Sequence, residues 1–190
     1  MGNFYLNYTV RSTDVEAITR LLEGHYAIVA STPTDHVIVY ADVGEIEDPT
    51  PLAVELSREL ETAVLVVMNH DDDILWYQLC ENGVCLDEYD STPNYFDGSA
   101  TEIAPPKGGN AHALCQAFGG KDVEAIETAL RRSYATNDPY VVAVERHADL
   151  AKLLNLPAWS YFFCYEDLVD DDLLEDLQED YPDVTLTKIS

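Results

Sequence analysis

The densest run of potential metal ligands in the sequence is the tetrapeptide at 70–73, a histidine followed by three aspartates. Imidazole nitrogens and carboxylate oxygens bind divalent cations, and a bound cation lowers the pKa of water enough to make it a nucleophile. Asp35 ends the turn between two predicted strands and His36 begins the second of them, at a sheet edge that we expect to be shared with His70. The candidate metal ligands are His36, His70, Asp71 and Asp73. Together they would make the protein a metal-dependent hydrolase.

A purely structural interpretation of these residues is favoured. No spacing here matches a known metal-binding motif, so the run is explained by an Asp-rich loop in which His36 and His70 cap two strands. Elsewhere in the chain, no nucleophile and base are nominated together by a catalytic signature. The sequence therefore predicts no catalytic residue and no cofactor, with a divalent metal as the alternative.

Two of the four cysteines flank a predicted hairpin turn. With a two-residue turn at Asn82-Gly83, Cys80 faces Cys85 at a non-hydrogen-bonded position, where side chains approach most closely. A cross-strand disulfide is geometrically available, whereas Cys115 and Cys164 stand alone. Because so few cysteines do not form a disulfide scaffold, the sequence favours reduced, partly buried thiols.

The same hairpin carries an aromatic cluster. The turn register places Trp76 opposite Tyr89, which predicts an aromatic patch where the hairpin leaves the sheet. Aromatic side chains rimmed by polar groups suit a partner or ligand surface, although they equally suit the joint between two lobes, which we favour. The candidate partner-binding residues are Trp76, Tyr89, Asp90, Tyr95 and Phe96.

Two further segments have local chemistry. Glu145-Arg146-His147 follows the predicted strand 140–144, and strand ends are a common place for functional groups in α/β units. Arg146 and His147 are also explained as partners of acidic neighbours or as residues at a helix start. The segment Pro105–Asn110 lacks a phosphate-binding glycine pattern and is predicted to be a loop in which Asn110 caps the next helix.

These residues need a scaffold, and the first part of the chain predicts a regular one. Hydrophobic patterns alternate between periods of two and 3.6 residues in the order βαββαβ. The predicted strands are Phe4–Val10, His25–Ala30, His36–Ala41 and Ala63–Met68, and the predicted helices are Val15–Leu22 and Pro51–Leu60. This order is that of a ferredoxin-like sheet with two helices on one face. The hairpin Ile74–Tyr89 extends it to six strands.

Residues 91–110 are rich in Pro, Gly, Asn and Ser and predict a connector. We expect a ferredoxin-like lobe at 1–98 and a smaller α/β lobe at 99–190, or one compact domain. The smaller lobe should contain helices Ala111–Phe118, Asp122–Tyr134 and Ala148–Leu154, strands Tyr140–Val144, Ser160–Cys164 and Val184–Ile189, and an acidic amphipathic helix over 166–181.

Charge narrows the classes of function. The 190 residues include 36 acidic and 10 basic ones, for a net charge of −26, yet 47% are apolar and can build a core. Such a charge repels nucleic acid and anionic lipid and attracts a basic protein or cationic ligand, although solubility alone also explains it. We find no membrane-spanning run and no secretory signal, and expect a cytoplasmic protein of undetermined oligomeric state.

Two stretches resemble an uncharacterised family of bacterial proteins. They are Tyr89-Asp-Ser-x-Pro93-x-Tyr95-Phe96 and Arg146-His147-x-x-Leu150-Ala151-x-x-Leu154-x-Leu156-Pro157. The resemblance implies a bacterial cytosolic protein and carries no activity. The sequence thus favours a non-enzymatic binding or regulatory protein, such as an immunity protein or inhibitor, whose acidic surface engages a basic partner. The alternative is the metal-dependent hydrolase.

Overall fold

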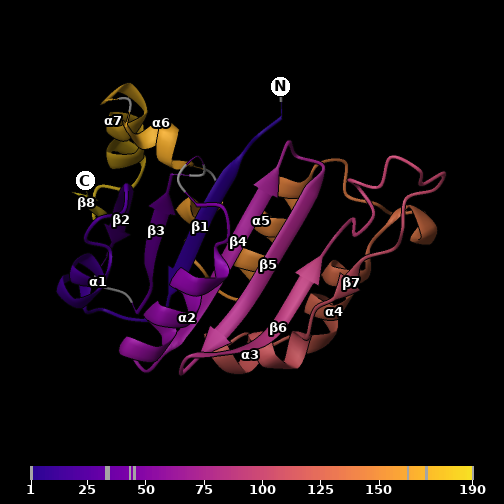
Figure 1. The fold of residues 1–190 in the computed structure, drawn as a ribbon, viewed down its shortest axis with the longest axis horizontal. Helices are drawn as coiled ribbons and strands as arrows, with labels where there is room; N and C mark the ends of the chain where they lie inside the picture. The colour runs from indigo at the N-terminus through magenta and orange to yellow at the C-terminus, as the bar shows by residue number, and fades with distance from the viewer. Residues whose placement is uncertain are drawn as a thin grey trace.

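A computed structural model describes residues 2–32, 35–42, 44, 46–161, 163–169 and 171–189. The fold is mixed α+β, with an open antiparallel sheet covered by helices on both faces (Figure 1). In the described part of the chain the sheet has eight strands in the order β7-β6-β5-β4-β1-β3-β2-β8. The strands are β1 (Tyr5–Val10), β2 (Ala27–Ser31), β3 (Val37–Ala41), β4 (Ala63–His70), β5 (Ile74–Glu81), β6 (Val84–Asp90), β7 (Lys107–Gly108) and β8 (Thr185–Ile189). The helices are α1 (Val15–Leu21), α2 (Thr50–Glu59), α3 (Ala111–Phe118), α4 (Val123–Arg131), α5 (Ala143–Leu153), α6 (Tyr165–Val169) and α7 (Asp171–Asp180).

Several helices begin where the sequence predicts them, because a polar side chain satisfies a free backbone N–H. Asp14 caps α1 by accepting a hydrogen bond from the backbone N–H of Ala17 at 2.9 Å. Asn110 accepts from Ala113 N at 3.1 Å and begins α3, which confirms its predicted role as a cap. Asp122 caps α4 in the same way.

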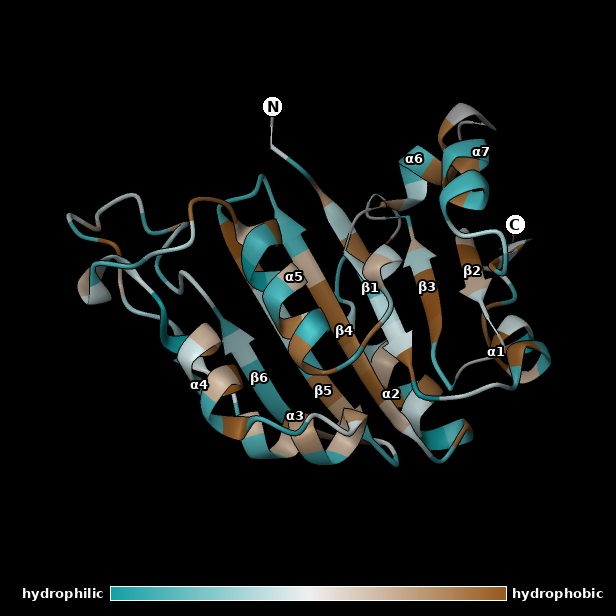
Figure 2. Ribbon diagram, turned by 180° about the vertical axis from the view of Figure 1, so that it is seen from behind, coloured by the Kyte–Doolittle hydropathy of each residue, from teal (hydrophilic) through white to brown (hydrophobic). Residues whose placement is uncertain are grey.

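The two faces of the sheet bury different helices. On one face, α1 and α2 pack on a cluster that includes Leu6, Tyr8 and Val10 of the central strand β1. On the other face, α3, α4 and α5 cover β4 and β5, and the residues of these two strands are largely hydrophobic (Figure 2). Helices α6 and α7 cover β2 and β3 on that same face. Both edge strands that follow residue 98, β7 and β8, belong to the one sheet, and the division into two lobes remains a prediction.

The predicted strand 140–144 is wrong. Ala143 already begins α5, and residues 140–142 are irregular. The side chain of Glu145 folds back and accepts hydrogen bonds from the backbone N–H groups of Val141 and Val142 at 3.0 and 3.5 Å. This contact uses backbone donors that a strand would need, so the two valines lead into a helix.

The predicted strand 160–164 is also wrong over its described residues. A 3₁₀ turn at Ala158–Ser160 is followed by irregular chain. The buried amide of Asn7 on β1 donates to the carbonyl oxygens of Ser160 and Phe163 at 3.0 and 3.1 Å. These bonds hold the segment across the face of the sheet, where it cannot join a strand edge.

The acidic tail forms two helices, α6 and α7, where one was predicted, and Asp170 between them lies outside the described residues. The predicted apolar stripe is only partly buried, because Leu177 is inaccessible whereas Val169 and Leu173 are exposed. The last predicted strand is confirmed as β8, which pairs with β2. With β7, it widens the predicted six-stranded sheet to eight strands.

Candidate functional site

A pocket of about 360 Å³ lies where two connecting segments meet the β4–β5 turn. The segments are 91–106, between β6 and β7, and 133–142, before α5, and they project at the right of Figure 1. The first turn of α5 completes the wall with Val142, Ala143 and Arg146. The volume falls in the range of small-ligand and peptide side-chain sites.

One part of the pocket wall is acidic. Asp72, Asp73, Asp97 and Glu102 line it, and none of the four has an ion-pair partner among the residues that the structure describes. The Asp72 carboxylate accepts from Asn69 Nδ2 at 2.8 Å and from the backbone N–H of Asn3 at 3.0 Å. The outward-facing Asp73 and Glu102 are both exposed, so their charges are available to a cation.

Another part is apolar and open to solvent. Tyr134, Val141 and Ile103 line the pocket and are 63%, 81% and 60% exposed. Tyr95 also lines it and donates to Asp73 Oδ2 at 2.8 Å, which raises the pKa of the phenol. Phe96, 74% exposed, packs edge-on against Tyr95 with ring centroids 5.0 Å apart. Exposed apolar side chains gathered around one pocket are a feature of interaction sites.

The base of the pocket contains a buried cation. Arg146 is 5% exposed, and Nη1 donates to the Tyr89 hydroxyl at 2.6 Å and to the carbonyl oxygens of Ala129 and Leu130 at 2.9 and 3.0 Å. Nη2 donates to the carbonyl oxygen of Arg132 at 2.7 Å. Burial lowers the pKa of the Arg146 guanidinium. No carboxylate lies within ion-pair distance of it in the described chain. The prediction that Arg146 pairs with acidic neighbours is therefore wrong.

The predicted shared edge of His36 and His70 is wrong. Val37, next to His36, pairs with Val10 at the end of β1, whereas Asn69, next to His70, pairs with Tyr5 at its start. The five residue-to-residue steps from Tyr5 to Val10, at about 3.4 Å each, separate the two ends by roughly 17 Å. β3 runs antiparallel to β1, so its first residue meets the last residue of β1, which the prediction overlooked.

Each histidine has other neighbours. His36 is buried, lies 3.1 Å from Asp35 Oδ1 through Nδ1, and stacks on Phe118. Burial lowers the pKa of its imidazole. His70 contacts the rings of Phe4 and Phe96, with centroids 4.9 and 5.2 Å apart. No group of three or more His, Cys, Asp or Glu side chains is arranged to hold a metal in the part of the chain that was described. The metal-dependent hydrolase gains no support from this arrangement.

The predicted aromatic register is wrong by one residue. A β-bulge between Leu79 and Cys80 shifts the pairing, so Trp76 lies opposite Asp90 and Tyr77 opposite Tyr89. Tyr89 is fully buried on the face of the sheet that α3, α4 and α5 cover, and its ring stacks on the Tyr77 ring with the centroids 5.1 Å apart. Trp76 packs with the cluster on the opposite face. Of the five predicted partner-binding residues, only Tyr95 lines the pocket, and Phe96 packs against it.

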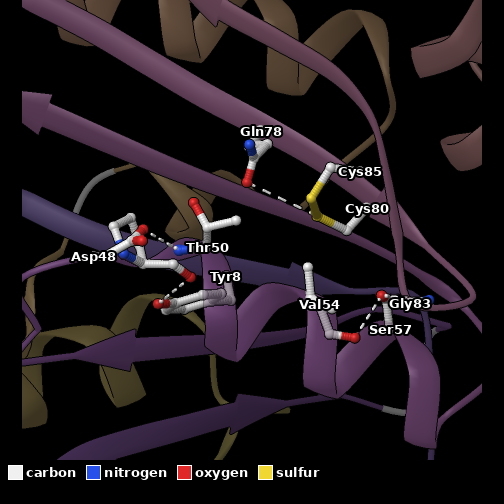
Figure 3. The surroundings of a disulfide bond; sticks show 10 residues. Tyr8, Asp48, Thr50, Val54, Ser57, Gln78, Cys80, Gly83 and Cys85 are labelled. Atoms are coloured by element: carbon white, nitrogen blue, oxygen red, sulfur yellow. Dashed lines mark hydrogen bonds between the residues drawn. A yellow bond between two sulfur atoms is a disulfide. The ribbon is translucent and has the colours of Figure 1, made fainter.

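The sequence-based prediction of reduced thiols at the hairpin is also wrong. Cys80 and Cys85 pair across the strands as predicted, and they form a disulfide (Figure 3). Figure 3 also shows the turn held by α2, where Gly83 N donates to Ser57 Oγ at 3.0 Å. The disulfide lies on the hairpin away from the pocket residues and fixes the strand pairing on the far side of the bulge.

Sequence analysis missed the pocket residues Glu102, Ile103, Tyr134 and Val141. Glu102 and Ile103 lie in a connector with no hydrophobic period, whereas Tyr134 and Val141 fall in the predicted helix Asp122–Tyr134 and strand Tyr140–Val144. No pattern therefore joins 91–106 to 133–142. The available signal was composition, since large apolar residues are uncommon in loops rich in Pro, Gly and Asn.

No protein-family model matches the chain, and comparison with curated proteins and with solved structures finds no significant similarity. Within the described residues, every helix is too short or too polar to cross a bilayer.

Proposed function

We propose that the protein is a binding or regulatory protein that takes a basic segment of a partner protein into the pocket between 91–106 and 133–142. An inhibitor or immunity protein would work in this way. The observation that carries the proposal is the combination, around one cavity, of exposed apolar side chains and four carboxylates that have no ion-pair partner among the described residues.

Lysine and arginine fit such a wall because their stems are apolar and their ends are charged. A stem packed on Tyr95 or Tyr134 would bring its charge to Asp73 or Glu102, and a cation over a tyrosine face gains a further favourable contact. The net charge of −26 would accelerate the encounter with a basic partner at low salt. The same charge disfavours nucleic acid as the partner.

The scaffold proposal is that residues 1–98 form a ferredoxin-like lobe extended by the hairpin. Its support is the placement of β1 between β3 and β4, together with α1 and α2 on one face. In this interpretation the hairpin, β7 and β8 are additions at the two edges, and the pocket lies on the added part.

The test measures binding of fluorescein-labelled peptides of about eight residues, rich in Lys and Arg, by fluorescence anisotropy. We expect affinity to fall about tenfold or more between about 50 and 300 mM salt, because salt screens exposed charges. Acidic peptides of the same length should not bind.

Two double variants with the same charge change locate the site. Asp73→Asn with Glu102→Gln should weaken binding of the basic peptide about tenfold. Glu16→Gln with Glu23→Gln, both exposed near α1 on the opposite side of the molecule, should leave it within twofold. Equal losses in the two double variants would show that the peptide senses only overall charge and would reject the pocket as the site.

A further inference from the structure

The Arg146 guanidinium is the pocket group that the proposed function leaves unused. A guanidinium has five N–H donors. Nη1 has three hydrogen-bond acceptors and Nη2 has one, whereas Nε has no acceptor among the described residues. A buried cation without a counter-ion is costly, since its desolvation is offset only by a paired charge or by good hydrogen bonds. The four hydrogen bonds and the Tyr140 ring, whose centroid lies 4.8 Å from Cζ, offset part of this cost. Arg146 still has no counter-ion among the described residues, and it retains donors that no described acceptor uses.

The start of α5 offers a second donor site next to it. Ala143 N donates to Asp72 O at 2.6 Å and Glu145 N to Val142 O at 3.2 Å, whereas Val144 N has no acceptor among the described residues. The free N–H of Val144 and the helix dipole favour an anion at this end of an 11-residue helix. Val142 and Ala143 line the same pocket as Arg146, so both features face one cavity.

The charges around the cavity restrict which anion would enter. Four carboxylates line the wall, and the whole molecule has a net charge of −26. A free anion is repelled at long range by such a molecule. A peptide end with basic side chains and one terminal carboxylate is attracted as a whole and still supplies an anion for Arg146.

We infer that the partner segment is a basic C-terminus, whose terminal carboxylate binds Arg146 and the first turn of α5 while its preceding basic side chains contact Asp73 and Glu102. This inference rests on the proposed function and names its ligand. Arginine suits the role because its planar fork binds carboxylates through two parallel hydrogen bonds.

The test uses one basic peptide sequence that carries the dye at its N-terminus. The peptide is made in two forms, one with a free C-terminal carboxylate and one with a C-terminal amide. The wild-type chain should bind the free acid at least about tenfold more tightly, a difference of about 1.4 kcal/mol. Equal affinities, with the Asp73/Glu102 double variant still weakening both, would overturn the carboxylate inference and leave the proposed function intact. Binding of neither peptide would overturn both.

Variants then assign the selectivity to a side chain. Arg146→Lys removes the fork and should abolish the preference for the free acid. Arg132→Lys is the matched control, because Arg132 Cζ also lies over the Tyr140 ring, at 4.6 Å against 4.8 Å for Arg146, but does not line this pocket. A preference that survives in Arg146→Lys would contradict the inference. If that variant fails to fold, the comparison of free acid and amide on the wild-type chain decides.

Discussion

The hydroxyl group of Tyr5 lies 2.7 Å from Nδ1 of His147, deep between the central strand β1 and helix α5. Burial lowers the pKa of His147 to about 3 and raises that of Tyr5, so both groups are neutral at pH 7. The two groups share one hydrogen bond whose donor depends on the imidazole tautomer, and the described residues provide no partner for Nε2. The contact joins the sheet to the helix that forms the base of the pocket.

The buried His147 should make the protein less stable in acid. Its pKa is about 3 when folded and 6.5 in the unfolded chain, so the unfolded state takes up the proton first as the pH falls. The neutral histidine contributes stability above pH 6.5, and about 1.4 kcal/mol is lost per pH unit below it. Urea unfolding of the wild type and of His147→Gln between pH 7 and about 4.5 should give a shallower dependence for the variant.

The difference between the two proteins is the informative quantity, because carboxylates titrate in both. His112→Gln, on the exposed surface of α3, is the control and should keep the wild-type pH dependence. If the free energy of unfolding depends on pH in the same way for His147→Gln and the wild type, His147 takes up its proton in the folded protein over this pH range.

Gly108 should tolerate no side chain. Its φ is +73°, and a Cβ there would overlap the backbone carbonyl of Glu88, because β7 lies directly against β6. We expect Gly108→Ala to lower the free energy of unfolding by about 2–3 kcal/mol or more through strain and backbone displacement. Gly98→Ala, in the connector that precedes β7 and with open space around it, should change stability by less than about 0.5 kcal/mol. Equal stabilities of the two variants in urea would contradict this account of β7.

The Cys80–Cys85 disulfide should contribute modestly to stability, because it closes a short loop of the chain. The chain-entropy model gives about 2 kcal/mol for a loop of this length. Dithiothreitol should therefore lower the free energy of unfolding of the wild type by about that amount and leave Cys85→Ser unchanged. Cys115→Ala, which keeps the disulfide, should respond to the reductant as the wild type does; a reductant effect in Cys85→Ser would point to another target.

The Tyr89 hydroxyl should be needed to hold the base of the pocket. It accepts from Arg146 at 2.6 Å and donates to Leu130 O at 2.9 Å, both in the buried interior. Tyr89→Phe removes one bond of each kind and should cost about 1–3 kcal/mol in thermal or urea unfolding. Tyr26→Phe, at a half-exposed position, should cost nothing measurable. If Tyr89→Phe leaves the stability unchanged, a water molecule replaces the hydroxyl group.

Local patterns in the sequence predicted the elements better than their contacts. Strand periodicity and the cap Asn110 are local signals, and the structure contains them. Val141 and Val142 have the β-branched composition of a strand, and only the capping contact of Glu145 turns them into a helix start. The bulge at Leu79 depends on pairing between whole strands, which turn chemistry alone does not determine.

The pocket was beyond prediction for a related reason. Arg146 was singled out, but its partners are backbone carbonyl groups and a tyrosine from other elements, which have no sequence signature. The carboxylates and aromatic side chains around it come from two connectors brought together only by the packing of α4 and α5 on the sheet.

Strand β8 pairs along the whole outer side of β2, from Ala27 opposite Ile189 to Ser31 opposite Thr185. During translation, β2 and β3 leave the ribosome long before β8 is made, so the nascent sheet keeps an open row of N–H and C=O groups on β2 for most of synthesis. An open, apolar strand edge is a template for intermolecular pairing. The yield of correctly folded chains therefore depends on the time between the synthesis of β2 and the pairing of β8 with it.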